Sequence, residues 1–416
     1  MAQDTPIHSI SQAQQAHDVL QEIARWGARV MLTSALRAEV DSYVAQFEDL
    51  RDEQGRRLVV RNGTCPERNI QTTMGPIPVA RPRVNDRRVA EDGTRFRFTS
   101  QILPPYLRKS KTLEDLIPWL YLRGISTGDF SEALAALVGK DAPSLSASTV
   151  VRLKKSWEEE YNAWRKRDLS NKRYAYIWAD GIHFNIRLEE GRQCILVLMG
   201  ATEDGFKEII AVQDGVRESE QSWRELLLQV KAQGLTIDPK LAIADGALGF
   251  WKALPQVWPD TRPQRCWVHK TANILNRLPK SSQPAAKAAI QDIWMAGSRA
   301  LAEKALATFV ETWSAKHPRA VECLLKDKDE LFTFYDFPAE HWRHLRTTNP
   351  IESTFATVRL RTKRTKGSGS RAACLAMVFK LAQSAQASWR KLNGYKLLAD
   401  VFRGVPFKHG IKAGAA

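Results

Sequence analysis

The sequence predicts a mixed α/β fold for the middle of the chain, and two observations support that prediction. Between residues 173 and 269, three strand-like runs are followed by alternating helix-like and strand-like runs, which indicates a mixed sheet. Two acids, Asp180 and Asp245, end strand-like runs, and a third, Glu352, opens a predicted helix farther along. We therefore expect one sheet that gathers three distant carboxylates into a single site.

The length and charge of the chain limit its class. At 416 residues the chain exceeds the size at which one core usually keeps growing, so about two to four domains are expected. The 62 lysines and arginines against 46 acids give a formal charge of +16, which favours a polyanionic partner such as nucleic acid. No apolar run approaches the roughly 20 residues that span a bilayer, and no signal-peptide pattern opens the chain, so we expect a cytoplasmic protein without a membrane partner.

The five cysteines are scattered along the chain and form no CxxC pair. This spacing argues against a disulfide framework and against a four-cysteine zinc site. A reducing compartment fits this pattern.

The first part of the chain divides into a helical region and a basic module. In the helical region, residues 1–50, apolar residues recur at helical spacing from residue 12 onward, which predicts two amphipathic helices. In residues 51–111, fourteen basic residues face six acids, and short extended runs alternate with glycine and proline. These runs are Leu58–Arg61, Ile77–Arg83 and Phe96–Thr99. A small basic β-containing module is the favoured interpretation, and a solvated linker is the alternative.

Residues 112–170 are expected to form a helix-turn-helix-like DNA-binding domain. The predicted helices are Thr112–Arg123, Gly128–Val138 and a third that starts at Ser146 or Ser148 and ends near Arg167. Thr149, Arg152 and Lys154 lie near the start of the third helix, where a recognition helix meets base edges or phosphates. Any three-helix bundle gives a similar pattern, so plain packing is the alternative.

Residues 171–269, called here the central region, are expected to form the first part of the α/β core. A helical insertion is expected at 270–346. Residues 347–416 are expected to add the closing helices of the core and a basic tail. The predicted strands of the central region are Tyr174–Ala179, Gln193–Thr202, Phe206–Val212, Leu241–Ala244 and Gln264–Val268, and its predicted helices are Glu218–Gln233 and Ala247–Leu254. The predicted helices of the insertion are Gln283–Met295, Arg299–Lys316 and Ala320–Glu330.

Two of the three acids have a good structural alternative. Asp-Gly is a strong hairpin signal, so Asp180 and Gly181 are also typical of a turn that leads into a partner strand. At Glu352, an Asn349 N-cap followed by proline gives a capping box, which would merely start a helix. Asp245 differs because it leads from the short apolar run LAIA into a helix, the position where open α/β sheets bind ligands.

A cationic stripe follows the third acid. Arg359 lies two helical turns after Glu352 on the same face. It is followed, with no acid between them, by Arg361, Lys363, Arg364, Lys366 and Arg371. Metal-dependent chemistry on a phosphodiester requires this combination, because two ions about 4 Å apart need several anionic oxygens while cations hold the flanking phosphates. A solvated charged face is the alternative.

Cys266 and His269 form a CxxH pair at the end of the last predicted strand. A zinc site needs four ligands, and no second pair stands near, so local packing or support of Asp245 is the favoured interpretation.

Four segments carry a resemblance to a known family. The stretches YAYIWADG, LAIADGALGFWKAL, QRCWVH and TTNPIESTFATVRLRTKR resemble, in the correct order, the signatures of the Mutator-type transposases of bacterial insertion sequences. The sequence RNG at 61–63 and the segments MGPIPVARPR and YLRGISTGDFSEAL are similar to the N-terminal half of that family. The resemblance implies an RNase H-like fold with a DDE triad, in which Asp180, Asp245 and Glu352 are the catalytic and metal-binding acids. Cys266 and His269 correspond to its C/DxxH pair, and Arg359 to its basic residue after the glutamate.

The resemblance also implies a function. A transposase of this type is expected to bind double-stranded DNA at terminal inverted repeats and at a target site, as a homodimer in the nucleoid of a bacterial cell. Two Mg²⁺ ions, for which Mn²⁺ substitutes, would support strand cleavage and strand transfer. A structure-selective RNase H-like DNA nuclease and a catalytically inactive DNA-binding regulator are the alternatives.

Overall fold

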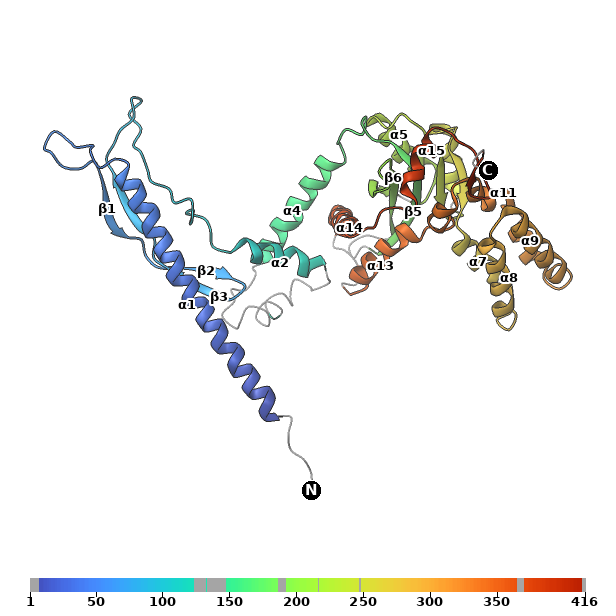
Figure 1. Cartoon of the computed structure of the whole chain (residues 1–416), viewed down its shortest axis with the longest axis horizontal. Helices are drawn as coiled ribbons and strands as arrows, with labels where there is room; N and C mark the ends of the chain where they lie inside the picture. Colours follow the sequence, from blue (N-terminus) through green and yellow to red (C-terminus); the bar gives the residue numbers. More distant parts are fainter. Residues whose placement is uncertain are drawn as a thin grey trace, which may run out of the picture. The chain divides into compact units, whose positions relative to one another are not determined.

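The computed structural model describes residues 7–122, 132, 147–185, 192–215, 217–246, 248–364 and 370–413 (Figure 1). The chain divides into two compact units, Met1–Val151 and Arg152–Ala416. Within the described ranges, we find no helix with the combined length and apolarity that crossing a bilayer requires.

The first unit begins with one continuous helix, α1 (Ile7–Ala45). The prediction of two helices in this region is therefore wrong. Residues 12–45 contain no proline and one glycine, Gly27. A single glycine inside a helix lowers its stability by only about 1 kcal/mol relative to alanine, so the helix continues through Gly27.

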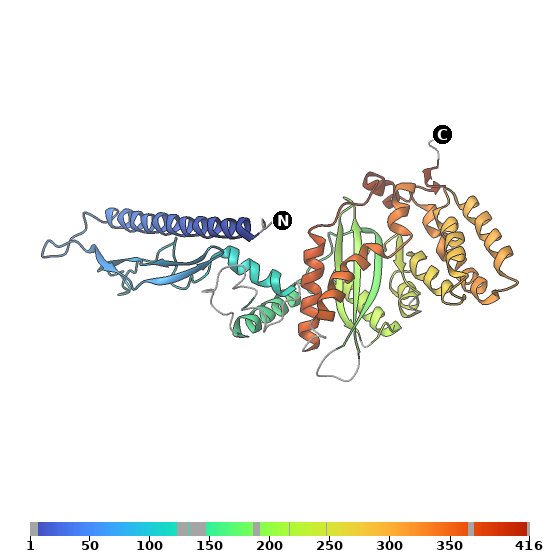
Figure 2. The same ribbon diagram turned by 90° about the horizontal axis from the view of Figure 1, so that it is seen from below.

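Four strands of the first unit form two separate antiparallel pairs. They are β1 (Val59–Thr64), β2 (Arg68–Thr72), β3 (Gly75–Val79) and β4 (Pro82–Asp86), and β1 pairs with β4 while β2 pairs with β3. Figure 2 shows α1 lying along these strands, and Leu36 of α1 packs with Ile70, Ile77, Val79 and Leu103 in a small core.

The strand expected at Phe96–Thr99 is absent from the structure, and β2 was not anticipated. The Phe96 ring packs on the Arg88 guanidinium, 4.7 Å from the ring centroid, so this aromatic run serves side-chain packing rather than a backbone ladder. The residues of β2 are mostly polar, and their pairing with β3 holds them in a strand.

Two of the three helices expected in residues 112–170 are described. These are α2 (Lys111–Leu122) and α4 (Ala147–Trp164). The helix expected at Gly128–Val138 lies outside the described residues, apart from position 132. Within the second unit, α4 packs on the sheet, since the Tyr161 hydroxyl donates to the Val212 carbonyl at 2.8 Å.

The second unit is built on one five-stranded sheet, which confirms the α/β prediction. The strands are β5 (Tyr174–Asn185), β6 (Arg192–Thr202), β7 (Lys207–Gly215), β8 (Leu241–Ala244) and β9 (Arg262–Arg265). Their order is β7-β6-β5-β8-β9, with β5, β6 and β7 antiparallel and β5, β8 and β9 parallel.

Helices cover the sheet on both faces. The helices α5 (Glu220–Ala232) and α6 (Leu248–Val257) form a large apolar core with one face, to which Ile177 of β5 contributes. Side chains alternate along a strand, so the opposite face receives Tyr176, whose ring packs against Phe337 and His341. The helix α13 (Asn349–Arg364) contacts β5, and α14 (Arg371–Gln386) contacts β7.

Two strand predictions in the sheet are corrected. The strand β5 runs through Asp180 and Gly181 to Asn185, with both residues paired to β6, so the hairpin alternative at Asp180 is wrong. The expected strand at Gln264–Val268 ends at Arg265, because β9 pairs only along the four residues of β8 and the chain then enters a helix.

The segment between the second and third acids is helical. It contains α7 (Trp267–Leu275), α8 (Gln283–Met295), α9 (Arg299–Trp313), α10 (Pro318–Leu325), α11 (Lys328–Phe332) and α12 (Trp342–Leu345), with short turns η1 (Thr333–Asp336) and η2 (Ala339–His341). The expected helix Ala320–Glu330 divides into α10 and α11, between which Asp327 pairs with Lys270. After α14 follow η3 (Tyr395–Leu397), α15 (Leu398–Phe402), β10 (Phe407–Lys408) and β11 (Ile411–Lys412).

Candidate functional site

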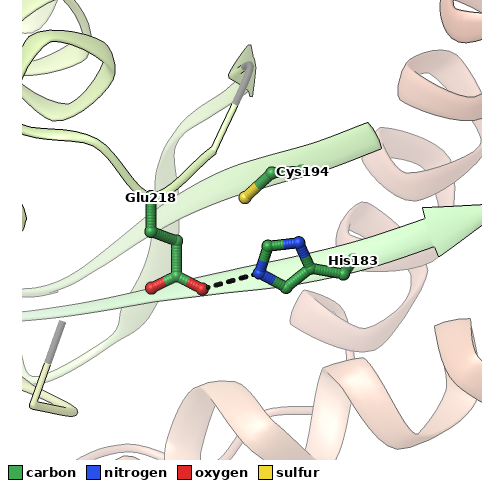
Figure 3. Close-up of side chains that lie close together, drawn as sticks. All are labelled: His183, Cys194 and Glu218. Atoms are coloured by element: carbon green, nitrogen blue, oxygen red, sulfur yellow. Dashed lines mark hydrogen bonds and ion pairs between the residues drawn. The ribbon is translucent and has the colours of Figure 1, made fainter. Parts of the chain in front are cut away.

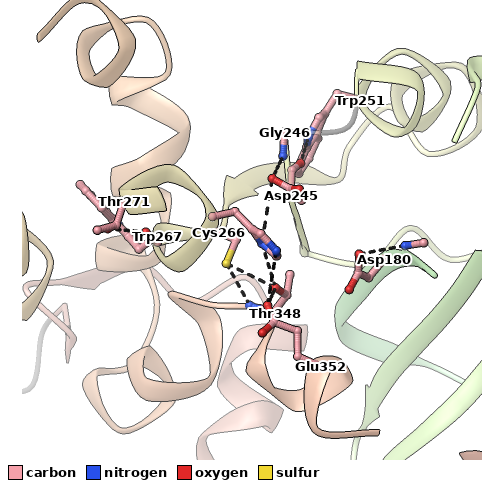
Figure 4. Close-up of polar contacts among 11 residues, drawn as sticks. Asp180, Asp245, Gly246, Trp251, Cys266, Trp267, Thr271, Thr348 and Glu352 are labelled. Atoms are coloured by element: carbon pink, nitrogen blue, oxygen red, sulfur yellow. Dashed lines mark hydrogen bonds and ion pairs between the residues drawn. The ribbon is translucent and has the colours of Figure 1, made fainter. Parts of the chain in front are cut away.

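The register of the sheet brings the first two acids together. Ala179 of β5 lies opposite Ala244 of the parallel neighbour β8, and Asp180 and Asp245 are the residues that follow this pair. Because Ala179 and Ala244 belong to the core beneath α5 and α6, strand alternation places Asp180 on the opposite face of β5. Figure 4 shows Asp180 and Asp245 facing the same region of the molecule as Glu352.

Asp180 lies in a largely buried position in the middle of β5, and its Oδ1 accepts a hydrogen bond from the Gly181 backbone at 2.8 Å. The pKa of Asp180 is raised to about 7, chiefly by burial. The nearby carboxylates of Glu218 and Glu352 also raise it, whereas His269 lowers it. A nearby cation would strongly stabilise the ionised form of such a buried carboxyl group.

Asp245 lies just beyond β8 and is more open, with 37% of its side chain exposed. Its Oδ1 accepts from the Gly246 backbone, and its carbonyl oxygen accepts from the Trp251 indole at 2.7 Å. The Arg265 guanidinium lies over the Trp251 ring, 4.5 Å from the ring centroid. The start of α6 therefore shapes the backbone on which Asp245 is presented.

Glu352 projects from the first turn of α13. The helix begins at Asn349 itself, so Thr348, rather than the expected Asn349, holds the position before it. The Thr348 hydroxyl donates to Glu352 Oε1 at 2.7 Å and lies 3.3 Å from Cys266 Sγ. Thr348 thus joins the third acid to the start of α7.

His269 connects the acids from the first turn of α7. Its Nδ1 lies 3.9 Å from Asp245 Oδ1, and its Nε2 lies 3.6 Å from Glu352 Oε1. The pKa of His269 is raised to about 9, first by the Cys266 side chain and then by Asp245 and Glu352. The site therefore combines three carboxyl groups with one imidazole ring.

Cys266 is buried, directly follows the last residue of β9 and is the N-cap of α7, so it lies at the end of the last strand as expected. Ligand atoms of Cys266, His269 and Glu352 lie within 4.8 Å of one another. His269 lies 3.9 Å from Asp245, whereas Cys266 contacts Thr348, and the support of Asp245 by this pair stays a prediction.

The expected DNA-contacting residues are described only in part. Arg359 lies on α13, exposed, with its guanidinium 6.0 Å from the Phe355 ring. The side chains that are not described are those of Arg361, Lys363, Arg364 and Thr149, and Lys366 lies outside the described residues. Arg371 is 3.8 Å from Asp214, and Arg152 and Lys154 lie on α4, where Arg152 is exposed.

A polar groove lies beside Asp245, and the sequence patterns did not indicate it. It encloses about 580 Å³ and is lined by Gly246, Arg265, Lys270, Asn273, Asn276, Arg277, Cys323, Lys326 and Asp327. Lys270 pairs with Asp327, and Arg265 pairs with Glu330, while Arg277 and Lys326 are exposed. The groove joins the end of β8 to the helices α7 and α10.

Comparison with known proteins identifies relatives along most of the chain. The family model described as "Transposase, Mutator family" matches residues 1–392. The transposase for insertion sequence element IS6120 of Mycolicibacterium smegmatis is 52% identical over 298 residues, which cover 72% of this chain and 92% of the relative. The transposase for IST2 of Acidithiobacillus ferrooxidans is 50% identical over 289 residues, covering 68% and 95%. The transposase for IS256 in transposon Tn4001 of Staphylococcus aureus is 28% identical over 326 residues, covering 77% and 79%.

Proposed function

Because the chain belongs to the Mutator family of transposases, we propose that it cuts and joins DNA at the ends of an insertion sequence, with Asp180, Asp245 and Glu352 as its catalytic acids. One observation carries this proposal. The register of β5 and β8 puts Asp180 and Asp245 on adjacent parallel strands, and both acids interact with His269, which also contacts Glu352.

The core that we propose is RNase H-like. Three antiparallel strands followed by two parallel ones, in the order β7-β6-β5-β8-β9, support this assignment. The first acid lies on the central strand and the second follows its parallel neighbour. In this proposal residues 171–269 and 347–416 form the core, and residues 270–346 form a helical insertion.

The donor set fits magnesium. Carboxylate oxygens are the ligands that Mg²⁺ prefers, and the acids converge from three separate elements. Asp180, Asp245 and Glu352 would hold two ions, for which Mn²⁺ would substitute. Bound ions of this kind activate a water or a 3′-hydroxyl and stabilise the charge on the leaving oxygen.

The other side chains of the site position the acids. The Thr348 hydroxyl fixes the rotamer of Glu352 through its 2.7 Å hydrogen bond. The His269 ring lies between Asp245 and Glu352, and in its protonated form it offsets part of their mutual repulsion. The Gly246 backbone and the Trp251 indole hold the residue that carries the second carboxylate.

The groove beside Asp245 is the path that we propose for the DNA backbone. Its exposed cations, Arg277 and Lys326, suit phosphate oxygens, and its asparagines Asn273 and Asn276 offer amide donors. Ion pairs of Lys270 with Asp327 and of Arg265 with Glu330 neutralise the other two cations, so the groove is moderately rather than strongly basic.

The N-terminal segments are the proposed readers of the terminal inverted repeats. Fourteen basic residues in 51–111 and the exposed Arg152 near the start of α4 support binding to DNA by residues 51–111 and 112–170. Two element ends must be held together, so we propose a homodimer that engages both ends and a target duplex in the bacterial nucleoid.

A cleavage assay tests the proposal. Full-length protein is incubated with Mg²⁺ and DNA that carries its own element ends, and we expect cutting at the ends followed by joining. Asp245→Asn should bind this DNA but not cut it. Asp204→Asn is the matched control, because Asp204 also precedes a glycine but lies exposed in the turn between β6 and β7. Undiminished cleavage by Asp245→Asn would refute the proposed site.

The same assay separates the alternative functions. Cutting without joining, or cutting that ignores the element ends, would favour a structure-selective nuclease. Binding to the ends by the unaltered protein without any cutting would favour a regulator that has lost catalysis.

A further inference from the structure

A second cluster of potential metal ligands lies near Asp180 but does not include it. Ligand atoms of His183, Cys194 and Glu218 all lie within 4.8 Å of one another, and His183 Nε2 is 3.1 Å from Glu218 Oε1. Figure 3 shows the three side chains converging from β5, β6 and the segment before α5. We propose that His183, Cys194 and Glu218 bind a zinc-like divalent ion, at a site separate from the catalytic acids.

The backbone fixes this cluster from two directions. His183 and Cys194 are direct partners in the antiparallel pair of β5 and β6, and such partners hold their Cβ atoms about 4.5 to 5.5 Å apart on one face of a sheet. Glu218 precedes Ser219, the N-cap of α5, whose hydroxyl accepts from the Ser222 backbone at 3.2 Å. Small side-chain rotations suffice to bring the three ligand atoms to coordination distance.

Gly181 makes room for the third ligand. A Cβ atom at this position would lie 2.5 Å from Glu218 Oε1, closer than real Cβ contacts occur. Gly181 lies two residues before His183 on the same strand, so both face Glu218. The absence of a side chain at Gly181 therefore lets the Glu218 carboxylate lie over β5.

The ligand types select the ion. Thiolate and imidazole ligands favour Zn²⁺ over Mg²⁺, which prefers oxygen. On binding, the Cys194 thiol transfers its proton to solvent, and the sulfur forms a bond to the ion. The thiolate and the Glu218 carboxylate together balance the two positive charges, so the complex is neutral and compatible with partial burial.

The exposure of the ligands leaves a place for a fourth one. Cys194 is fully buried, whereas the side chains of Glu218 and His183 are 24% and 43% exposed. The open coordination position therefore faces solvent and accepts a water molecule. An ion here would join β5, the strand that carries Asp180, to β6 and to the start of α5.

Cobalt substitution tests the site in the full-length protein. Bound Co²⁺ should give a sulfur-to-cobalt charge-transfer band, and Zn²⁺ should displace it. Because Cys266 belongs to the other group of potential ligands, the band is measured in the Cys266→Ala background as well. We expect the band to persist there and to vanish when Cys194→Ala is added to that background. The buried thiol of Cys374 provides the control, and Cys374→Ala should keep the band.

Two further variants guard against misfolding of Cys194→Ala. His183→Gln and Glu218→Gln leave the buried thiol in place and should weaken cobalt binding at least about tenfold, since even partners outside the coordination shell change metal affinity by 10- to 100-fold. No band in Cys266→Ala, or a band that survives when Cys194→Ala is combined with Cys266→Ala, would overturn the proposal. None of these readouts involves DNA, so they are independent of the proposed transposition chemistry.

Discussion

The substitution Thr348→Val tests whether the residue before α13 orients the third acid. Valine has nearly the shape of threonine, so it removes the hydroxyl and little else. The hydroxyl donates to Glu352 Oε1 at 2.7 Å and lies 3.3 Å from Cys266 Sγ and 3.4 Å from His269 Nδ1. The contact between the Thr348 backbone amide and Cys266 survives the change.

The size of the effect follows from these contacts. Partners that orient a metal ligand typically contribute 10- to 100-fold in metal affinity or activity, so we expect a loss of about 10- to 100-fold in cleavage at low Mg²⁺. Part of this loss should be recovered at high Mg²⁺, because Glu352 itself remains. The free energy of unfolding should change by only about 1 kcal/mol, the usual contribution of one hydrogen bond.

The assay is a Mg²⁺ titration of end cleavage, with thermal unfolding of the same samples in chelator. Thr348→Ser is the matched control, since it keeps the hydroxyl and should stay close to the unaltered protein. If Thr348→Val cleaves as well as Thr348→Ser at every Mg²⁺ concentration, Thr348 does not position Glu352.

Three further predictions concern other parts of the second unit. Chelation with EDTA should abolish cleavage but leave binding to element ends intact, and added Mn²⁺ should restore cutting; cutting in chelator would refute the metal assignment. Arg277→Glu should weaken DNA binding and reduce the salt slope by about 0.9 for each phosphate that the protein no longer neutralises, whereas Lys287→Glu, outside the groove, should do neither. Burial lowers the pKa of His344 from 6.5 to about 4. The stability that the neutral His344 ring contributes is therefore fully present above pH 6.5 and is lost as the pH falls toward 4. Between these pH values the unaltered protein should lose stability relative to His344→Gln. Thermal unfolding in chelator measures this difference.

Local patterns in the sequence were sufficient for many helices. The bounds of α8, Gln283–Met295, agree with the prediction, because the apolar periodicity within the helix is a local signal. The same reasoning divided α1 into two helices, because the apolar periodicity is weak in the middle of this helix and does not show whether the helix continues. At the break between α10 and α11, Asp327 pairs with Lys270, a contact between residues distant in the sequence that no local pattern shows.

Strand predictions failed where pairing decides the outcome. The dipeptide Asp180-Gly181 is equally compatible with a turn and with a strand, and only its pairing with Val197 and Leu196 of β6 makes it a strand. The end of β9 at Arg265 is likewise set by the length of β8.

For the candidate site, the sequence by itself determined which residues are available and in what order. It indicated one acid after a short strand, another at a helix start and a family of DNA-transposing enzymes, because motif order and local periodicity are written in the chain, whereas its placement of Asp180 at a strand end was wrong. Only the tertiary structure decided that Ala179 pairs with Ala244, that His269 lies between Asp245 and Glu352, and that Glu218 lies over Gly181. These contacts join residues far apart in the sequence, and their energies depend on packing and register that no local pattern encodes.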